Sequence, residues 1–284
     1  MNYEDNPKSI KYYVKRYLLA HREELKNKKI VDLPAGHGVT SRILQEIGAE
    51  PLPMDLFPEY FSVEGLTCQK ADIQDHIPLE DKAADYAICQ EGIEHFSDQL
   101  HTFREFSRIL KVGGGLLMTT PNYSSLRARL SYFLSESERY NRMMPPNELD
   151  SVWFSKDDSS DDIYLGHVFL IGIQKMRVLA RLAGFEITEV QFTRSRPTST
   201  LLLPLFYPFI LISNWISYRK NLKKKDGFDQ QVKKKIYGEI FRLGTNVKLL
   251  VGSHLFVRFE KKMDTADVKE NLLSYVDSYE RKPD

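Results

Sequence analysis

A short apolar strand that runs through a glycine turn into a helix constrains the fold more than any other feature of this sequence. Residues 28–48 read KKIVDLPAGHGVTSRILQEIG. The run from Ile30 to Leu33 has the length and composition of a buried strand, and the amphipathic run after the turn has helical spacing and stops at Gly48. A strand that leads directly into a helix is the first half of a βαβ unit, so a sheet covered by helices is expected.

The same alternation continues along the chain. Strands that lack period-two polarity and alternate with helices are typical of a parallel sheet that is covered on both faces. The last strand, SHLFVRFEKK (253–262), alternates apolar and polar residues like an antiparallel edge strand. We therefore predict a doubly wound α/β domain over residues 1–262, followed by a polar C-terminal tail (263–284). The other predicted strands are EPLPMDL (50–56), LTCQKADI (66–73), DYAICQE (85–91), GLLMTTPN (115–122) and FEITEVQF (185–192), and amphipathic helices are predicted at 8–27, 97–110 and 173–183.

Two segments interrupt this alternation. Residues 121–166 are polar and aromatic and contain the acidic run KDDSSDD, and residues 194–252 contain a long apolar run followed by a basic one. Segments of this length without the strand and helix pattern are usually functional, often as covers over a site. We expect both to be inserted covers.

The net charge of the chain is too small to attract a charged partner to the molecule as a whole. The net charge is +1, so neither nucleic acid nor an acidic surface would attract the whole molecule. The two cysteines, Cys68 and Cys89, lie in apolar runs without ligand spacing and are expected to be reduced thiols. The first residues, MNYEDNPKSI, lack an apolar signal segment, which favours a cytoplasmic protein. Nothing in the sequence sets the oligomeric state.

The glycine turn favours a nucleotide-like ligand. Gly36 and Gly38 allow the backbone to approach a ligand closely, and the helix that follows presents free N–H groups. Asp55 ends the second predicted strand, 19 residues after Gly36. A carboxylate at this place can accept hydrogen bonds from both hydroxyls of a ribose. Such a turn with a later acid also suits a dinucleotide site.

The order of five motifs indicates which family of nucleotide-binding proteins the chain resembles. DLPAGHG, then Asp55, ADIQD, DYAICQEGIEHF and RILKVGGGLLMTTPN resemble the class I S-adenosylmethionine-dependent methyltransferases, closest in style to the small-molecule branch that includes quinone-pathway O-methyltransferases. The resemblance covers residues 28–122, and 166–193 more loosely. It implies a Rossmann-like sheet of seven strands, mostly parallel with an antiparallel last strand, and S-adenosylmethionine as the cofactor.

The resemblance also implies a cofactor site at the ends of four strands. Each position is carried over from the motif that contains it. Asp32, Gly36 and Gly38 would hold the amino-acid end of the cofactor, Asp55 the ribose, Leu56 the adenine, Asp72 with Ile73 the adenine amino group, and Gln90 with Glu91 the methionine part.

Pro34 departs from the family pattern, which usually has glycine there. Proline removes an N–H donor and fixes φ near −65°. The detail of carboxylate binding is therefore expected to differ, and a non-catalytic relative that binds the cofactor without turnover stays an alternative. A nicotinamide-dependent oxidoreductase is a second alternative, but AGHGVTS lacks the third glycine of a dinucleotide motif.

Two histidines are candidates for the base that takes a proton from a hydroxyl acceptor. His95 follows the fourth strand and His167 stands where the first inserted segment returns to the core, so both are expected on the open face near the methyl group. Glu91 and Glu94 are further candidates, although surface carboxylates are common. The other five histidines form no constellation, and no spacing suggests a metal site.

The second inserted segment has the composition of a membrane contact. Residues 197–218 carry no charge, and 22 residues are enough to cross a bilayer. The segment lies between two strands of one sheet, however, so a single crossing is excluded under the recognised fold. The basic run 219–235 is suited to anionic lipid and offers no stacking pattern for nucleic acid. We expect a hydrophobic or lipid-like small-molecule acceptor and a peripheral contact with an anionic membrane through 197–235. A lid over the site and an interface with another chain are the alternatives for the apolar segment.

Overall fold

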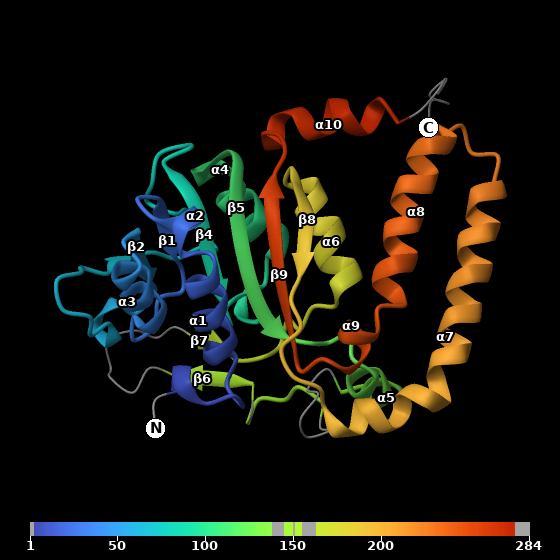
Figure 1. The fold of residues 1–284 in the computed structure, drawn as a ribbon, viewed down its shortest axis with the longest axis horizontal. Coiled ribbons are helices and arrows are strands. Elements are labelled where there is room, and N and C mark those ends of the chain that lie inside the picture. Colours follow the sequence, from blue (N-terminus) through green and yellow to red (C-terminus); the bar gives the residue numbers. More distant parts are fainter. Residues whose placement is uncertain (1–2, 138–144, 150, 155–162, 276–284) are drawn as a thin grey trace.

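A seven-stranded sheet with the strand order β3-β2-β1-β4-β5-β9-β8 forms the centre of the molecule (Figure 1). The computed structural model describes residues 3–137, 145–149, 151–154 and 163–275. The strands of the sheet are β1 (Lys29–Asp32), β2 (Glu50–Asp55), β3 (Gln69–Lys70), β4 (Ala84–Gln90), β5 (Leu110–Pro121), β8 (Phe185–Val190) and β9 (His254–Lys261).

The strand directions confirm the predicted fold class. The pairs β1–β2, β1–β4, β2–β3 and β4–β5 are parallel, whereas β9 is antiparallel to both β5 and β8. The prediction that the last strand lies at an edge is wrong, because β9 lies between β5 and β8. Its polar side chains have partners in the covering layers: Lys261 Nζ donates to the carbonyls of Ser107 and Leu110 at 2.7 and 2.9 Å.

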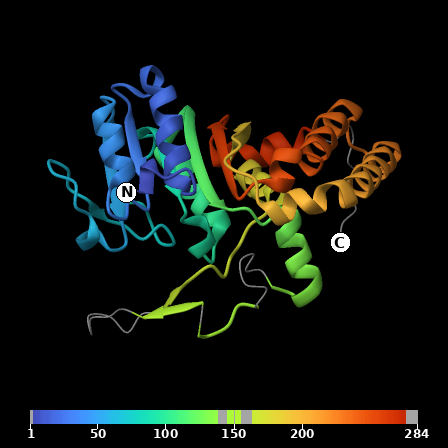
Figure 2. The same cartoon turned by 60° about the horizontal axis from the view of Figure 1, so that its bottom comes forward.

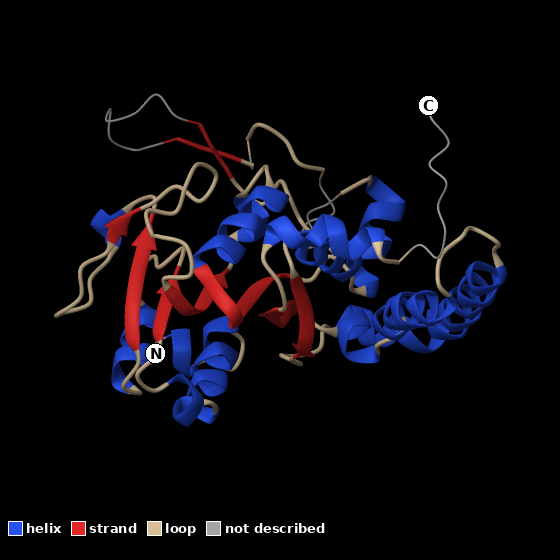
Figure 3. Ribbon diagram, turned by 90° about the horizontal axis from the view of Figure 1, so that it is seen from above, coloured by secondary structure: helices blue, strands red, loops and turns tan. Residues whose placement is uncertain are grey.

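Helices cover both faces of the sheet (Figure 3). Alternate residues of the central strands face opposite sides, so that Ile30 and Ile88 pack with one helical layer and Val31 and Cys89 with the other. This double burial explains why these strands read as continuous apolar runs. The first layer contains α1 (Ile10–Ala20), α2 (Arg22–Leu25) and α3 (Val39–Glu46), and the second contains α4 (Gln99–Ile109) and α6 (Ile173–Leu182).

The third strand is much shorter than LTCQKADI predicts. Only Gln69 and Lys70 are in β3, and both are exposed at the edge of the sheet. The chain then turns, because Asp72 Oδ1 accepts the N–H of Gln74 at 2.8 Å. This side-chain turn replaces the ladder that a longer strand would form.

Both inserted segments carry secondary structure of their own. In the first, β6 and β7 form an antiparallel pair that extends away from the sheet (Figure 2, yellow-green). The acidic run KDDSSDD lies outside the described residues. The elements of the inserted segments are α5 (Leu126–Ser135), β6 (Val152–Phe154), β7 (Ile163–Leu165), α7 (Pro197–Lys223), α8 (Gln230–Gly244) and α9 (Val247–Val251), and the tail contributes α10 (Thr265–Leu273).

The apolar run forms one long helix, α7, that contains Pro204 and Pro208. Figure 1 shows that α7 changes direction in its first half and then runs beside α8. Each proline removes a helical N–H donor and clashes with the preceding turn, which bends a helix. The two prolines therefore bend α7, as their spacing predicts, but the helix continues through them. Tyr218 and Phe241, 5.9 Å apart between ring centroids, hold the two helices together.

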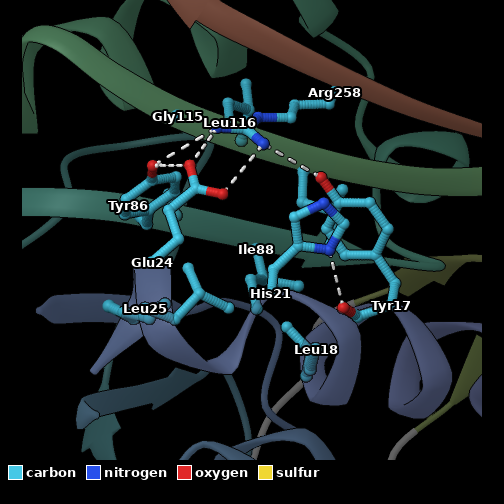
Figure 4. Close-up of a pocket in the computed structure, with 13 residues that line it drawn as sticks. Tyr17, Leu18, His21, Glu24, Leu25, Tyr86, Ile88, Gly115, Leu116 and Arg258 are labelled. Carbon is cyan, nitrogen blue, oxygen red and sulfur yellow. Dashed lines mark hydrogen bonds and ion pairs between the residues drawn. The ribbon is translucent and has the colours of Figure 1, made fainter. Parts of the chain in front are cut away.

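The first helical layer is joined to the sheet by a polar cluster around Arg258 (Figure 4). The Arg258 guanidinium pairs with Glu24 and reaches the hydroxyls of Tyr17 and Tyr86 at 3.3 Å each. These side chains surround a cavity of about 20 Å³, which is enough for one water molecule and too small for a ligand. The cluster therefore has a structural role.

Candidate active site

The predicted site residues gather at one edge of the sheet. β1, β2 and β4 end at Asp32, Asp55 and Gln90, and all three strands run in the same direction. Ligands of open α/β sheets bind beyond the carboxyl ends of the strands. The topology thus brings together residues that lie up to about 60 positions apart in the sequence.

Asp32 is buried at the start of the glycine turn, with 1% of its surface exposed. Its Oδ2 accepts a hydrogen bond from Ser41 Oγ of α3 at 2.6 Å, while its Oδ1 has no partner among the described residues. Burial raises the pKa of this carboxyl to about 7. A buried acceptor without a partner is costly, and an ammonium group would satisfy it. The residues present therefore fit the amino-acid end of S-adenosylmethionine.

The two glycines of the turn shape the backbone and do not offer free donors. Gly36 and Gly38 have φ values of 53° and 84°. The Gly36 N–H donates to Asp55 Oδ2 at 2.7 Å, and the Gly38 N–H donates to the Ala35 carbonyl at 2.9 Å. A Cβ at Gly36 would meet nothing within 4 Å, so open space adjoins the turn where a ligand can lie.

Asp55 connects the second strand to the glycine turn. Its Oδ2 holds Gly36, its Oδ1 accepts the Phe57 N–H at 2.9 Å, and the residue is 7% exposed. Each oxygen retains a lone pair for a further donor, as a ribose hydroxyl requires. Leu56, next along the chain, is partly exposed at the same edge. The two assignments stay predictions.

Asp72 and Ile73 have different surroundings. Asp72 is exposed, and one of its oxygens is used in the turn after β3. Ile73 is 2% exposed and belongs to the main hydrophobic core, so only its backbone is placed to contact an adenine. The assigned adenine contact thus rests on the second oxygen of Asp72 and on backbone groups.

Gln90 and Glu91 border the glycine turn on its other side. Thr40 Oγ1 of α3 donates to Gln90 Oε1 at 2.8 Å, and Thr119 Oγ1 of β5 donates to Glu91 Oε1 at 3.1 Å. Burial, together with the charge of nearby Glu94, raises the pKa of the Glu91 carboxyl. Both side chains are thus fixed in place before any ligand binds.

Pro34 has a packing role that the sequence did not reveal. A Cβ placed on Gly92 would lie 2.6 Å from Pro34 Cδ. The glycine after β4 is therefore required for close contact between the two loops. Pro34 lies in the loop after β1 and sets how closely the loop after β4 can approach it. Proline lacks the N–H donor that a glycine would offer at this position.

The two candidate histidines lie side by side. The ring centroids of His95 and His167 are 4.9 Å apart, although the residues are separated by the whole first inserted segment. Two hydrogen bonds bring their loops together: the Phe169 N–H donates to the Glu94 carbonyl at 3.1 Å, and Gln99 Nε2 donates to the Phe169 carbonyl at 2.6 Å. This contact supports the expectation that both histidines face the same space.

Glu94 lies next to the histidine pair and is not a surface carboxylate. The residue is fully buried, its Oε2 accepts a hydrogen bond from Thr120 Oγ1 at 2.8 Å, and its Oε1 has no partner in the described part of the chain. Ligand atoms of Glu94, His95 and His167 lie within 4.8 Å of one another, close enough for one metal ion to contact all three. No spacing in the sequence indicated this group.

Replacing Glu94 with glutamine is expected to remove part of the pH dependence of folding. Burial raises the pKa of this carboxyl from 4.5 to about 7, so the unfolded chain releases the proton first as the pH rises. The free energy of unfolding of the wild type should therefore fall relative to that of the variant as the pH rises from 4.5 to 7.5. Urea unfolding at the two pH values measures this difference, with the exposed Glu59→Gln as the control. If the free energy of unfolding changes with pH equally in the wild type and in Glu94→Gln, the raised pKa of Glu94 is contradicted.

Sequence reasoning missed His254, which it placed in no constellation. His254 starts β9 and is paired in register with Pro121 at the end of β5. Its Nε2 lies 3.6 Å from Glu91 Oε2. The signal was available in principle, because an antiparallel strand beside β5 must begin where β5 ends.

Comparison with known proteins agrees with this geometry. Residues 6–190, nearly two thirds of the chain, match the model of a family described as a methyltransferase domain. The chain is 28% identical over 153 residues to the ubiquinone biosynthesis O-methyltransferase of Xanthomonas campestris, a match that covers 48% of this chain and 64% of that protein. It is 27% identical over 159 residues to the protein of the same name from Psychrobacter cryohalolentis, covering 49% and 62%. The chain thus spans less than two thirds of the length of these relatives.

Solved structures share the fold. An S-adenosylmethionine-dependent methyltransferase from Mesorhizobium loti aligns over 91% of this chain and 100% of its own, with a TM-score of 0.51 and 16% identity. A second, from Archaeoglobus fulgidus, aligns over 92% and 98%, with a TM-score of 0.51 and 15% identity. With the matching family model, the strand order and the acid-lined edge of the sheet, the chain belongs to the class I S-adenosylmethionine-dependent methyltransferases.

Proposed function

We propose that this protein transfers a methyl group from S-adenosylmethionine to a hydroxyl group of a small hydrophobic or lipid-like acceptor. The observation that carries the proposal is the contact between His95 and His167 beyond β4, next to the residues assigned to the methionine part of the cofactor. A hydroxyl acceptor needs a base in such a place. The relatives named O-methyltransferases support the choice of oxygen.

The chain's own groups divide the work of the reaction. Bound S-adenosylmethionine supplies an electrophilic methyl group on a sulfonium. Asp32 would hold its amino-acid end and Asp55 its ribose, and placing donor and acceptor in line can provide about 7–11 kcal/mol of the barrier reduction. His95 or His167 takes the proton from the acceptor hydroxyl. The neighbouring Glu94 carboxyl can balance the charge that the imidazole gains.

The two inserted segments meet beside this site, which supports a covered acceptor. The N–H of Arg127, in the first turn of α5, donates to Ser199 Oγ in the first turn of α7 at 3.1 Å, and Ser199 is fully buried. α7 therefore starts at the covered edge of the sheet and leads away from it. An acceptor held there would lie next to the most apolar helix of the molecule.

α7 exposes an apolar surface that water disfavours. Within the described residues it is the helix that is long and apolar enough to cross a membrane, and 6% of its apolar window is buried. Leu201, Phe209 and Trp215 are 77%, 68% and 55% exposed. Exposed apolar surface on this scale marks an interaction site. Because β8 and β9, on either side of the segment, pair in one sheet, we propose that α7 lies on the membrane surface, with a cytoplasmic body above it.

A basic cluster follows at the end of α7, consistent with contact to anionic lipid. The cluster has fewer members than the sequence indicated, because Lys233 is 2% exposed and its Nζ donates to Asp226 at 2.7 Å. Basic residues near a membrane surface contribute about 1 kcal/mol each. The exposed members at this end of the helix hairpin are Arg219, Lys220, Lys223, Lys224, Lys225, Lys234 and Lys235.

Charged substitutions on the exposed face of α7 are expected to release the protein from vesicles. Phe209→Glu and Ile216→Glu should each lower co-sedimentation with phosphatidylglycerol-containing liposomes several-fold, because an ionised side chain resists burial in lipid. Leu19→Glu, at an exposed apolar position on α1, is the matched control. Each lysine of the cluster replaced by glutamine should weaken binding by about fivefold. Unchanged binding of both α7 variants would refute the attachment.

Thermal denaturation with S-adenosylmethionine, S-adenosylhomocysteine and NAD in parallel tests the cofactor. At 100 times its dissociation constant, a ligand stabilises the fold by about 2.7 kcal/mol. We expect a rise in Tm with the first two and none with NAD. A shift with NAD alone would favour the oxidoreductase alternative, and cofactor binding without turnover of any hydroxyl acceptor would favour the non-catalytic one.

A further inference from the structure

Two arginines project from the extended segment that joins β8 to α7. Ser195 in this segment forms an antiparallel bridge with Gly252, and the flanking backbone hydrogen bonds are Arg196 N–H to the Val251 carbonyl at 2.8 Å and Ser253 N–H to the Arg194 carbonyl at 2.9 Å. Side chains of an extended chain alternate between its two sides. Arg194 and Arg196 therefore lie on the same side, at the edge of the sheet where the site lies.

The arginine pair adjoins the site through His254. His254 follows Ser253, whose N–H donates to the Arg194 carbonyl, and its Nε2 lies 3.6 Å from Glu91 Oε2 while its Nδ1 lies 2.9 Å from Ser253 Oγ. Burial, followed by the charges of Arg196 and Arg194, lowers the pKa of His254 to about 4. The positive charges of the two arginines thus act on a group that touches the methionine side of the proposed cofactor site.

The Arg194 guanidinium contains a donor without an acceptor. Its Nε is buried and has no hydrogen-bond partner among the residues that the structure describes. Leaving a buried charged donor unsatisfied is costly, and a guanidinium N–H without a partner can bind an oxygen of a planar anion. No other described residue of this chain meets this N–H.

We infer that Arg194 and Arg196 form an anion subsite that binds a carboxylate or phosphate group of the methyl acceptor. The inference rests on the proposed function and deepens it: the acceptor would carry an apolar body toward α7, a hydroxyl toward His95 and His167, and a negative group toward the arginine pair. A guanidinium binds such a group through two parallel hydrogen bonds, which an ammonium cannot reproduce.

Three small ligands that share a phenylpropyl group and differ in their polar end test whether the site prefers a negative charge. Calorimetric titration of the S-adenosylhomocysteine complex with 3-phenylpropionate, 3-phenylpropyl phosphate and uncharged 3-phenylpropanol should show that at least one of the two anions binds about 10-fold or more tighter than the alcohol. The preferred anion identifies the group as carboxylate or phosphate. Arg194→Gln should weaken binding of that anion by about 10- to 100-fold and leave the alcohol unchanged. Arg194→Lys should show an intermediate loss.

Arg22→Gln, an exposed arginine paired with Glu23 on α2, is the matched control and should keep the preference. Equal affinity for the anions and the alcohol, absence of binding by either anion, or an Arg194→Gln protein that binds the anion as wild type does would overturn the inference. The titrations are repeated without S-adenosylhomocysteine. Failure of S-adenosylhomocysteine to bind would count against the methyltransferase function, while the anion preference in its absence tests the arginine pair separately.

Discussion

Replacing His95 with glutamine is expected to lower kcat for methyl transfer by about 100- to 10,000-fold, the usual contribution of a positioned base. Glutamine keeps a polar side chain of similar reach but cannot accept the hydroxyl proton. Because His95 and His167 lie 4.9 Å apart between ring centroids, a hydroxyl near one ring also lies near the other. The affinity for S-adenosylmethionine should change little, since neither ring is assigned to the cofactor.

The single and double variants together assign the base. If the two histidines act as one unit, His167→Gln should be slow as well, and the double variant should be little slower than the slower single variant. His21→Gln, beside the small cavity at Arg258, is the matched control and should retain full activity. A metal ion held by Glu94, His95 and His167 would instead make the wild-type rate sensitive to a chelator and restorable by a divalent cation. A His95→Gln enzyme with wild-type kcat would refute the roles of His95 as base and as metal ligand, and His167 would then be the candidate base.

The cofactor half of the molecule could be predicted from the sequence because its signals are local. A strand that enters a glycine turn and a helix is written in consecutive residues, and so is an acid at the end of a strand. Asp32 and Asp55 end β1 and β2 in the structure, and the amphipathic patterns of 8–27 and 173–183 correspond to buried helix faces. Each of these features is determined within about one turn or one strand of its own position.

The acceptor half depends on contacts that no local pattern records. The burial of Glu94 comes from Thr120 of β5 and from the returning loop at Phe169, both distant from it in the sequence. His254 lies near Glu91 only because β9 is inserted between β5 and β8. The sequence places Lys233 in a basic surface run, but in the structure its Nζ is buried against Asp226 and the Lys224 carbonyl. All of these contacts come from the order of strands and inserted segments.

Replacing Asp55 with alanine is expected to lower the affinity for S-adenosylmethionine by more than about 100-fold. The carboxylate would accept hydrogen bonds from two ribose hydroxyls, and hydrogen bonds to a charged group contribute about 1.5–3 kcal/mol each. The same carboxylate holds the Gly36 N–H at 2.7 Å and the Phe57 N–H at 2.9 Å. Alanine therefore removes both the direct contacts and the support of the glycine turn, so the two losses add.

Asp55→Asn separates these two contributions. Asparagine keeps one carbonyl acceptor, which can hold either Gly36 or Phe57 but cannot hold both and also accept from a ribose. Calorimetric titration with S-adenosylhomocysteine should therefore place Asp55→Asn between wild type and Asp55→Ala, while Glu59→Gln, an exposed residue four positions later, should bind as wild type does. Far-UV circular dichroism of each variant shows whether the sheet persists. If Asp55→Ala is folded and binds with wild-type affinity, Asp55 does not hold the ribose, and another acceptor at this edge of the sheet must do so. Asp72 would be the next residue to replace, because it is exposed and uses one oxygen in the turn after β3.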